Sequence, residues 1–359
     1  MKTRRVEYFS CFNPQDFPGI FRKIDDSVLS LRKSGLDAEN RNFLANFRGF
    51  IDFAFSLFKT NADVVVVRNF FQIPIFFPVF VYLRLRRKYL VIDIPTPLAV
   101  VLKEFDLRER MSKWAIRARK GMVSLFYPYA LFPFNRVIHY AEESAYFSFG
   151  LKGKIELMAN GIDVERYELK KKDVSLAENS IVLLAVAKVS AWHGFDRVLS
   201  GISNYVSSKS ADIDLKLYIA GDGDEIENLK KIAERLKISE NVSFLGFKSH
   251  NQLGAYFDIA DIGVSSLGLH RKGLDSASSL KTREYAARGL PMIVSGQDLD
   301  LLPNPHFAHL VPNSDEPIDM LKVIRWYESL PKNGINREVI RSFALERMDF
   351  KNKVKFFLP

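Results

Sequence analysis

The stretch SSLKTREYAARGLPMIVS, residues 278–295, has the pattern of a short helix followed by a short buried strand. Its charged part, from Lys281 to Glu284, stands where the helix begins, after a loop rich in Gly and Ser. Gly289 and Pro291 end the helix and allow the strand to start. A helix start presents free backbone N–H groups and partial positive charge. The stretch therefore predicts an α/β fold with an anion-binding helix start at a sheet edge.

Apolar runs and helical patterns alternate along the rest of the chain. In the second half the expected strands are SIVLLAVAKV, LKLYIAGDGD, NVSFLGF, DIGVSSL and PMIVSG. In the first half they are RRVEYFSCF, ADVVVVRN, YLVIDIPT and RVIHYAEE, with helices expected at residues 20–32, 51–58, 75–85 and 107–120. Continuous apolar runs are typical of strands covered on both faces. Strands that alternate with helices indicate parallel, doubly wound sheets, which bind ligands at the carboxyl ends of their strands.

The length of 359 residues suits two domains better than one ordinary core. A polar, charged segment follows Gly161, so we place the domain boundary near residue 165. We predict two Rossmann-like domains, residues 1–165 and 166–335, that face each other across a cleft. Residues 336–359 are predicted to form a helix and a tail that cross back to the first domain.

The net charge of +10 is unevenly distributed. Residues 1–150 hold 23 Lys and Arg against 14 Asp and Glu, whereas residues 151–359 hold 29 against 28. A basic half favours an anionic partner, such as a phosphate-bearing substrate, nucleic acid or an anionic membrane surface. The chain has no recognised nucleic-acid module, so we expect no nucleic-acid partner. The segment 107–122 places apolar residues on one face and six Lys and Arg on the rest, which is typical of a helix lying on anionic lipid. A core-packed helix with a solvated basic face is the alternative.

The single cysteine, Cys11, excludes a disulfide within the chain and fits a reducing compartment. The N-terminal segment lacks the apolar region of a signal peptide, so we expect a cytoplasmic protein. The most apolar stretch, residues 64–83, is interrupted by Arg68, Asn69 and two prolines. We interpret it as a strand, a turn and a core helix rather than as a membrane span.

This order of segments resembles the GT-B glycosyltransferases, in particular the retaining family often called family 4. The resemblance is carried by AKVSAWHGFDRVL, by LYIAGDGDEIENLKKIAERL with VSFLGF, and by SLKTREYAARGLP. It covers residues 161–296 by motif and the first half by architecture alone. The segment WHGFDRVL also resembles a signature of transferases that build bacterial surface polysaccharides. The resemblance implies an enzyme that moves a sugar from a nucleotide diphosphate sugar to an acceptor with retention of configuration.

The resemblance implies a donor diphosphate site formed by two parts of the second domain. Lys188 ends the first strand of this domain, and His193 stands where the family commonly has a Lys before the helix glycine. Two cations there would stabilise the departing diphosphate, although the charge of His193 is left open. Backbone amides for the diphosphate would come from Ser278, Ser279 and Leu280. Lys281 would add a positive charge, and the Glu284 carboxylate would accept hydrogen bonds from the ribose hydroxyls. Lys188, His193 and Glu284 are the catalytic candidates.

The donor sugar and the base have weaker candidates. The family usually carries a second Glu eight residues before the first, but Ser276 occupies this position here, beside Asp275. Either Asp275 substitutes for that acid or the acid is absent. The backbone of Gly246, Phe247 and Lys248 is expected to contact the nucleotide base.

On the acceptor side the candidates are Gly19, in a loop after the first strand, and Asp93, at the end of a later strand. His139 is interpreted as a core histidine rather than a catalyst. Asp222 and Asp224 resemble a D-x-D metal motif, but they lie in a Gly-rich turn before a helix, where acids favour the helix start. We therefore expect no metal site.

The nucleotide sugar is a substrate, so no cofactor is expected, and a UDP-sugar is favoured over a GDP-sugar. The expected acceptor is a glycan or a lipid-diphosphate-linked acceptor. The expected location is the cytoplasm, with peripheral binding to the inner face of the plasma membrane. Two alternatives keep the fold. One is a nucleotide-sugar epimerase, and the other is a nucleotide-sugar-binding partner subunit without catalysis, because one family acid is missing.

Overall fold

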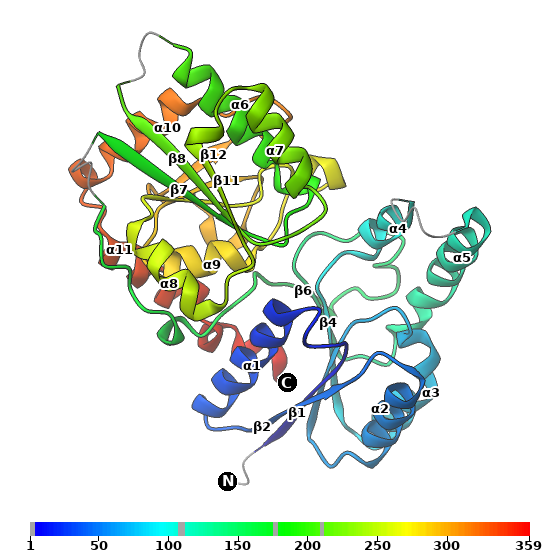
Figure 1. The fold of residues 1–359 in the computed structure, drawn as a ribbon. Coiled ribbons are helices and arrows are strands. Elements are labelled where there is room, and N and C mark those ends of the chain that lie inside the picture. Colours follow the sequence, from blue (N-terminus) through cyan, green and yellow to red (C-terminus); the bar gives the residue numbers. More distant parts are fainter. Residues whose placement is uncertain (1–3, 107–111, 175–178, 209–211) are drawn as a thin grey trace. The chain divides into compact units, whose positions relative to one another are not determined.

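The computed structural model describes residues 4–106, 112–174, 179–208 and 212–359 (Figure 1). The chain divides into two compact units, Met1–Asp163 with Asp349–Pro359 and Val164–Met348. The first boundary lies two residues from the predicted one, whereas the returning segment is much shorter than the predicted 336–359. The reason is that helix α11 (Arg337–Phe343) packs against helix α9 (Leu280–Ala287) and so belongs to the second unit.

The first unit is built on a parallel sheet of six strands in the order β2-β1-β3-β4-β5-β6. The strands are β1 (Arg5–Cys11), β2 (Asp37–Phe43), β3 (Val64–Arg68), β4 (Tyr89–Ile94), β5 (Arg136–His139) and β6 (Ile155–Leu157). The helices are α1 (Pro18–Lys33), α2 (Phe47–Lys59), α3 (Phe77–Leu85), α4 (Leu98–Asp106) and α5 (Lys113–Ala130), with the 3-10 helices η1 (Ile73–Phe76) and η9 (Phe350–Phe357).

Two apolar clusters cover the two faces of this sheet. Helices α2, α3, α4 and α5 pack on one face with η1, whereas α1 and the returning helix η9 pack on the other. The strands with the longest apolar runs, such as β3, lie in the middle of the sheet and are buried on both faces. Residues 64–83 form β3, η1 and most of α3, as the sequence predicts. Among the described residues, no helix has both the length and the hydropathy that a membrane span requires.

The second unit contains a second parallel sheet, in the order β12-β11-β10-β7-β8-β9. Its strands are β7 (Ser180–Val186), β8 (Asp214–Ala220), β9 (Val242–Gly246), β10 (Ile262–Val264), β11 (Met292–Ser295) and β12 (Ala308–Val311). Its helices are α6 (Phe195–Val206), α7 (Ile226–Arg235), α8 (His250–Ile259), α9, α10 (Met320–Ser329) and α11. Short 3-10 helices include η2 (Val164–Arg166), η3 (Ala191–His193), η4 (Ser239–Asn241), η5 (Leu269–Lys272), η6 (Leu299–Leu301) and η7 (Pro331–Asn333), and a π-helical turn, η8 (Ala344–Met348), follows α11.

Helices cover both faces of the second sheet, with α6, α7 and α10 on one side and α8, α9 and α11 on the other (Figure 1). Each unit is thus a parallel sheet covered by helices, which confirms the predicted α/β class with two Rossmann-like domains. In the second unit, β7 and β10 are the central pair, and the carboxyl ends of all strands meet at one edge.

Candidate functional site

The candidate site follows the carboxyl edge of the second sheet. Along this edge the strand order β9, β8, β7, β10, β11 brings together the segments that follow each strand. These segments are the Gly246 turn, the glycine turn after β8, the η3 turn after β7, the serines after β10 and the loop after β11. The chain topology therefore gathers the sequence-predicted donor residues of the second domain at one edge.

The glycine turn after β8 packs tightly against the segment that leaves β7. A Cβ on Gly221 would lie 1.7 Å from the carbonyl oxygen of Ala187, and one on Gly223 would lie 2.0 Å from that of Val189. Both glycines also have positive φ angles, +136° and +146°. The backbone N–H of Val189 donates to the carbonyl of Asp222 at 2.6 Å. These glycines are required because two backbones touch here.

His193 is held as a neutral hydrogen-bond donor. Its Nδ1 accepts from the backbone N–H of Ser190 at 3.1 Å, so Nε2 carries the ring proton. The ring stacks between Trp192 and Phe195, with centroids 3.8 and 5.4 Å away. Burial, followed by repulsion from Lys281, lowers the pKa of His193 to about 2. This resolves the question of charge, because His193 contributes an N–H group and not a cation at neutral pH.

Lys281 lies in the first turn of α9 and provides a cation near His193. Its ammonium nitrogen is buried without a hydrogen-bond partner in the described part of the chain, and it stands 5.5 Å from the centroid of the Phe195 ring. Burial lowers the pKa of Lys281 to about 7. The hydroxyl of Ser279, the N-cap residue, makes no capping hydrogen bond in the described structure. A buried ammonium beside a helix start without a side-chain cap has the chemistry that an anion-binding site requires.

Glu284 stands one turn further along α9. Its carboxylate accepts from the Arg288 guanidinium at 3.1 Å, and the side chain is largely buried. The guanidinium of Arg288 in turn lies over the ring of Phe257, 4.4 Å from its centroid. The carboxylate is therefore oriented by a neighbour on its own helix.

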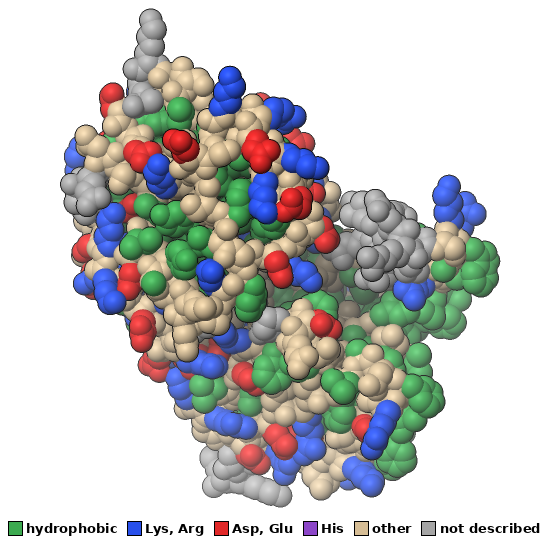
Figure 2. Space-filling model, viewed as in Figure 1, with side chains coloured by type: hydrophobic (Ala, Val, Ile, Leu, Met, Phe, Trp, Pro, Cys, Tyr) green, Lys and Arg blue, Asp and Glu red, His purple; other side chains and the backbone are tan. Residues whose placement is uncertain are grey.

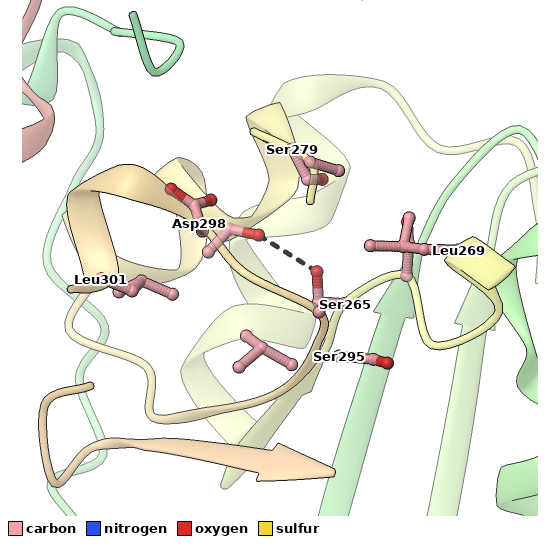
Figure 3. A pocket seen from close by; sticks show the side chains of 11 residues that line it. Ser265, Leu269, Ser279, Ser295, Asp298 and Leu301 are labelled. Carbon is pink, nitrogen blue, oxygen red and sulfur yellow. Dashed lines mark hydrogen bonds between the residues drawn. The ribbon is translucent and has the colours of Figure 1, made fainter. Parts of the chain in front are cut away.

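A small pocket with a cavity volume of about 20 Å³ lies between the start of α9 and the ends of β10 and β11 (Figure 3). Five residues with hydroxyl groups contribute to its lining, and they are Ser265, Ser266, Ser279, Thr282 and Ser295. The hydroxyls of Ser265 and Thr282 are 3.0 Å apart and hydrogen-bonded. A space of this size admits about one water-sized polar group, with which these hydroxyls can form hydrogen bonds.

Of these hydroxyl residues the sequence analysis identified only Ser279, and it did not identify the arginine that positions α9. Arg283 is fully buried, and its guanidinium bonds the carboxylates of Asp298 and Asp300 in the loop after β11. The available signal was the pair Ser265-Ser266 directly after a buried strand, at the ligand edge of a parallel sheet. No such signal exists for Arg283, since charged residues in helices are usually exposed.

The remaining donor candidates lie at exposed parts of the same edge. Lys188 is exposed two residues beyond β7. Gly246 ends the edge strand β9 with φ of +67°, and its carbonyl accepts from the N–H of Gly221 at 2.9 Å. Phe247 is 67% exposed, and Lys248 beside it is half-buried. An exposed aromatic ring at this position is available for stacking on a base.

The loop before α9 contains the two donor-sugar candidates. Asp275 is exposed, and its carboxylate accepts from the Asn313 side chain at 3.3 Å. Ser276 forms a bridge with Gln297, from the loop after β11. Gly296 permits this contact, because a Cβ there would lie 2.6 Å from the carbonyl oxygen of Asp275. The loop is therefore fixed against the end of β11.

On the acceptor side, the structure separates the two candidates by exposure. Gly19 is exposed in the first turn of α1. Asp93 is fully buried, and its Oδ2 accepts from Tyr8, from Arg68 at 2.7 Å and from Lys23 at 3.4 Å. Arg68 and Lys23 hold the Asp93 pKa below its usual value against the effect of burial. Asp93 thus lies near the end of β4, as the sequence indicates, and is part of a buried ion cluster.

Two further sequence interpretations concern His139 and the acidic turn. His139 is buried, and burial lowers its pKa to about 4, as a neutral core histidine requires. Asp222 and Asp224 are exposed in the turn after β8. Among the described residues, no group of three His, Cys, Asp or Glu side chains is placed to hold a metal ion.

The arrangement of two helix-covered parallel sheets matches solved glycosyltransferases. HepE of Anabaena, solved in complex with UDP, has a TM-score of 0.63 at 14% identity, and the match covers 98% of each chain. A glycosyltransferase from Rickettsia africae has a TM-score of 0.64 at 12% identity, over 99% of this chain and 97% of that one. The fold is therefore the GT-B fold. Residues 167–297 match the family Glycosyl transferases group 1, and this part of the chain is a domain of that family.

Two curated relatives carry the same name. The Alpha-monoglucosyldiacylglycerol synthase of Streptococcus pneumoniae is 26% identical over 172 residues, which is 45% of this chain and 35% of that protein. The protein of that name from Acholeplasma laidlawii is 23% identical over 135 residues, or 38% and 32% of the two chains. The match thus spans about a third of the length of these relatives.

Proposed function

We propose that this protein is a glycosyltransferase that moves a sugar from a nucleotide diphosphate sugar to an acceptor, with retention of configuration. The observation that carries the proposal is the buried ammonium of Lys281, which lacks a hydrogen-bond partner among the described residues and stands at the start of α9. A buried cation without a partner costs free energy unless an anion joins it. The diphosphate of the donor is the anion that this family would place there.

The proposed chemistry depends on stabilising the diphosphate as it leaves. Lys281 supplies a charge, the N–H groups at the start of α9 supply dipoles, and the His193 Nε2–H supplies a neutral hydrogen bond. Lys188 is assigned a second contact with the diphosphate, and Glu284 is assigned to the ribose hydroxyls. No metal ion is required by this assignment, because the protein groups themselves offset the developing charge.

We propose a UDP-sugar as donor and a lipid-linked or glycan acceptor. The support for UDP is that HepE, of the same fold, was solved with UDP and with UDP-glucose. The support for a lipid acceptor is the name of the curated relatives, which refers to a glucosylated diacylglycerol. The proposed location is the cytoplasmic face of the plasma membrane.

One observation favours a second function, a nucleotide-sugar-binding subunit without catalysis. Ser276 occupies the position of the family acid, and Asp275 is bonded to Asn313. Such a subunit would bind the donor and transfer nothing. The epimerase alternative has no comparable observation.

The first experiment is a thermal-shift panel of UDP-, GDP- and other nucleotide sugars, followed by transfer assays with the donor that binds. Lys281→Ala and Glu284→Ala should lower kcat/KM about ten- to hundred-fold, from the loss of about 1.5–3 kcal/mol per charge-assisted hydrogen bond. Full activity in both variants would remove the site assignment. Binding of a donor without transfer to any acceptor favours the non-catalytic subunit. Activity should survive EDTA, and its loss on chelation with recovery on Mg²⁺ or Mn²⁺ would contradict the metal-independent mechanism.

A further inference from the structure

Helix α2 carries an apolar stripe on the side that does not face the core. Phe53 and Leu57 of this helix are fully buried against the sheet. Four large apolar side chains on another side of α2 are exposed, with Phe47 the most exposed at 82%; they are Phe47, Ile51, Phe55 and Phe58. Their spacing of four, four and three residues places them along one line of the helix surface. An aromatic stripe exposed to water is unfavourable unless something covers it.

Helix α5 repeats this arrangement. Val123 and Tyr127 pack into the core, whereas the opposite side exposes Trp114, Met122, Leu125, Phe126 and Tyr129. Trp114 is 79% exposed. The spacing again follows one helix face, so α5 has a second apolar face that is directed away from the core. Helix α5 overlaps the membrane-surface helix that the sequence analysis expected at residues 107–122. Residues 107–111 of that expected helix lie outside the described structure.

Both stripes belong to one layer of the first unit. Helices α2, α3 and α5 share one apolar core against the same sheet face, and η1 lies in contact with both α3 and α5. Ile75 of η1 and Leu85 of α3 are exposed as well, at 69% and 79%. Figure 2 shows hydrophobic side chains gathered over α5 and over the α2–α3 region. We call the outward side of α2, η1, α3 and α5 the apolar layer surface.

Charge around this surface is predominantly positive. Helices α2 and α5, together with α3 and the three residues that follow it, hold ten Lys and Arg and one acid, Asp52. Helix α5 alone has four basic residues and no acidic residue. Lys113 and Arg117 are exposed and flank its apolar stripe. Apolar and aromatic side chains bordered by cations match an anionic lipid surface, where the rings enter the interface and the cations meet headgroups.

We propose that the apolar layer surface docks on an anionic lipid bilayer, with the aromatic stripes of α2 and α5 inserted into the interface. A protein partner would need a complementary patch that is both apolar and strongly acidic. An anionic bilayer offers acidic headgroups and an apolar interior everywhere on its surface. The proposal rests on the membrane location in the proposed function and deepens it by naming the surface and the lipid class, and lipid binding itself requires neither donor nor acceptor. Vesicle binding and nucleotide binding can therefore fail independently.

The test is co-sedimentation of the full chain with lipid vesicles at low and high salt. The vesicles contain either phosphatidylcholine alone or phosphatidylcholine with about 30% phosphatidylglycerol, which gives a surface potential of tens of millivolts. We expect binding to anionic vesicles at least tenfold tighter than to neutral ones at low salt, and a decrease in binding at high salt. We also expect a blue shift of tryptophan fluorescence with anionic vesicles that is absent from Trp114→Phe.

Two sets of variants separate insertion from charge attraction. The double variant Phe55→Ser and Phe126→Ser should lower vesicle binding at least tenfold while UDP affinity stays unchanged. The double variant Lys113→Glu and Arg117→Glu should lower vesicle binding at low salt. It should also reduce the salt dependence of binding, because the net charge of α5 falls from +4 to zero. Leu310→Ser is the matched control, since Leu310 is 53% exposed in the second unit and should not affect lipid binding.

Three results would overturn the proposal. One is equal binding to neutral and anionic vesicles, and another is unchanged binding in the double serine variant whose melting temperature matches the parent. The third is no binding to any vesicle together with concentration-dependent dimerisation that the serine variant abolishes, which would assign the surface to a second copy of this chain.

Discussion

The fully buried guanidinium of Arg283 is paired with the carboxylate of Asp298, from the loop that follows β11. Asp300 in the same loop adds a third carboxylate contact at 3.0 Å. This pair ties α9 to the end of the neighbouring strand and so sets where the helix begins. Lys281 and Glu284 stand on either side of Arg283 along the chain, so the buried pair positions the candidate donor groups.

Replacing Asp298 by Asn should destabilise the second unit and loosen the donor site together. Breaking a buried ion pair leaves an uncompensated charge and costs about 3–5 kcal/mol, with the lower end expected here because Asp300 remains. Denaturant unfolding and UDP titration would measure the two effects. The control is Glu227→Gln, whose partner Lys230 is a surface residue, and it should leave the melting temperature unchanged. An Asp298→Asn protein with parental stability would show that the pair does not hold α9.

Binding of UDP should be accompanied by proton uptake at Lys281. Burial lowers the Lys281 pKa from 10.5 to about 7, and an adjacent diphosphate raises it again. At pH 8 the free site is mostly neutral, so binding should take up close to one proton, and affinity should fall by up to about tenfold per pH unit above 7. For the ligand-free protein the sign is opposite: the unfolded chain binds the proton between pH 7 and 10.5, so this lysine makes stability rise with pH across that window.

Calorimetry in two buffers of different ionisation enthalpy would measure the uptake. Lys281→Arg keeps a charge that does not titrate, so it should bind UDP without the uptake, and Lys281→Met should lose both. His193 should not contribute, because its pKa lies near 2. Equal heats in both buffers for the parent protein would rule out a titrating lysine at the diphosphate.

The glycine turn after β8 should not tolerate a methyl group. In Gly221→Ala the new Cβ would overlap the Ala187 carbonyl oxygen, and the backbone would be held at φ of +136°. We expect a loss of at least about 2 kcal/mol in the free energy of unfolding. Gly254→Ala is the control, because a Cβ inside helix α8 meets nothing within 4 Å and should stabilise the protein by about 0.5–1 kcal/mol. Similar stability in the two variants would contradict the close approach.

The extent to which the sequence predicts this fold follows from burial. Strand β7 is covered on both faces and is a continuous apolar run, so its pattern predicts it directly. Strand β2, with the sequence DAENRNF, is an edge strand that is mostly half-buried. Because its residues are mostly polar, the apolar pattern does not predict it. Its position depends on backbone pairing with β1, which residue type does not encode.

The candidate site shows the same division. The charge at the start of α9 could be predicted, because a Ser-rich loop, a Lys and a helix pattern are adjacent in the chain. That Lys281 is buried and that His193 is neutral depend on Phe195 and on the Ser190 amide, and these relationships exist only after folding. Asp93 illustrates the opposite case. Its place at a strand end could be predicted, but nothing in the sequence indicates that Arg68 and Lys23 converge on it from other elements.

Asp93→Asn should therefore act on stability before it acts on transfer. The substitution leaves Arg68 and Lys23 buried without their carboxylate, and losing one partner of a buried pair costs about 3–5 kcal/mol. The first unit should melt at a lower temperature, whereas UDP binding by the second unit should be retained. Asp52→Asn is the matched control, because Asp52 is an exposed residue that faces Arg48 at 4.0 Å, and its melting temperature should equal that of the parent. An Asp93→Asn protein with parental melting temperature and lost transfer would restore Asp93 to the acceptor site and would show that the buried cluster tolerates a neutral amide.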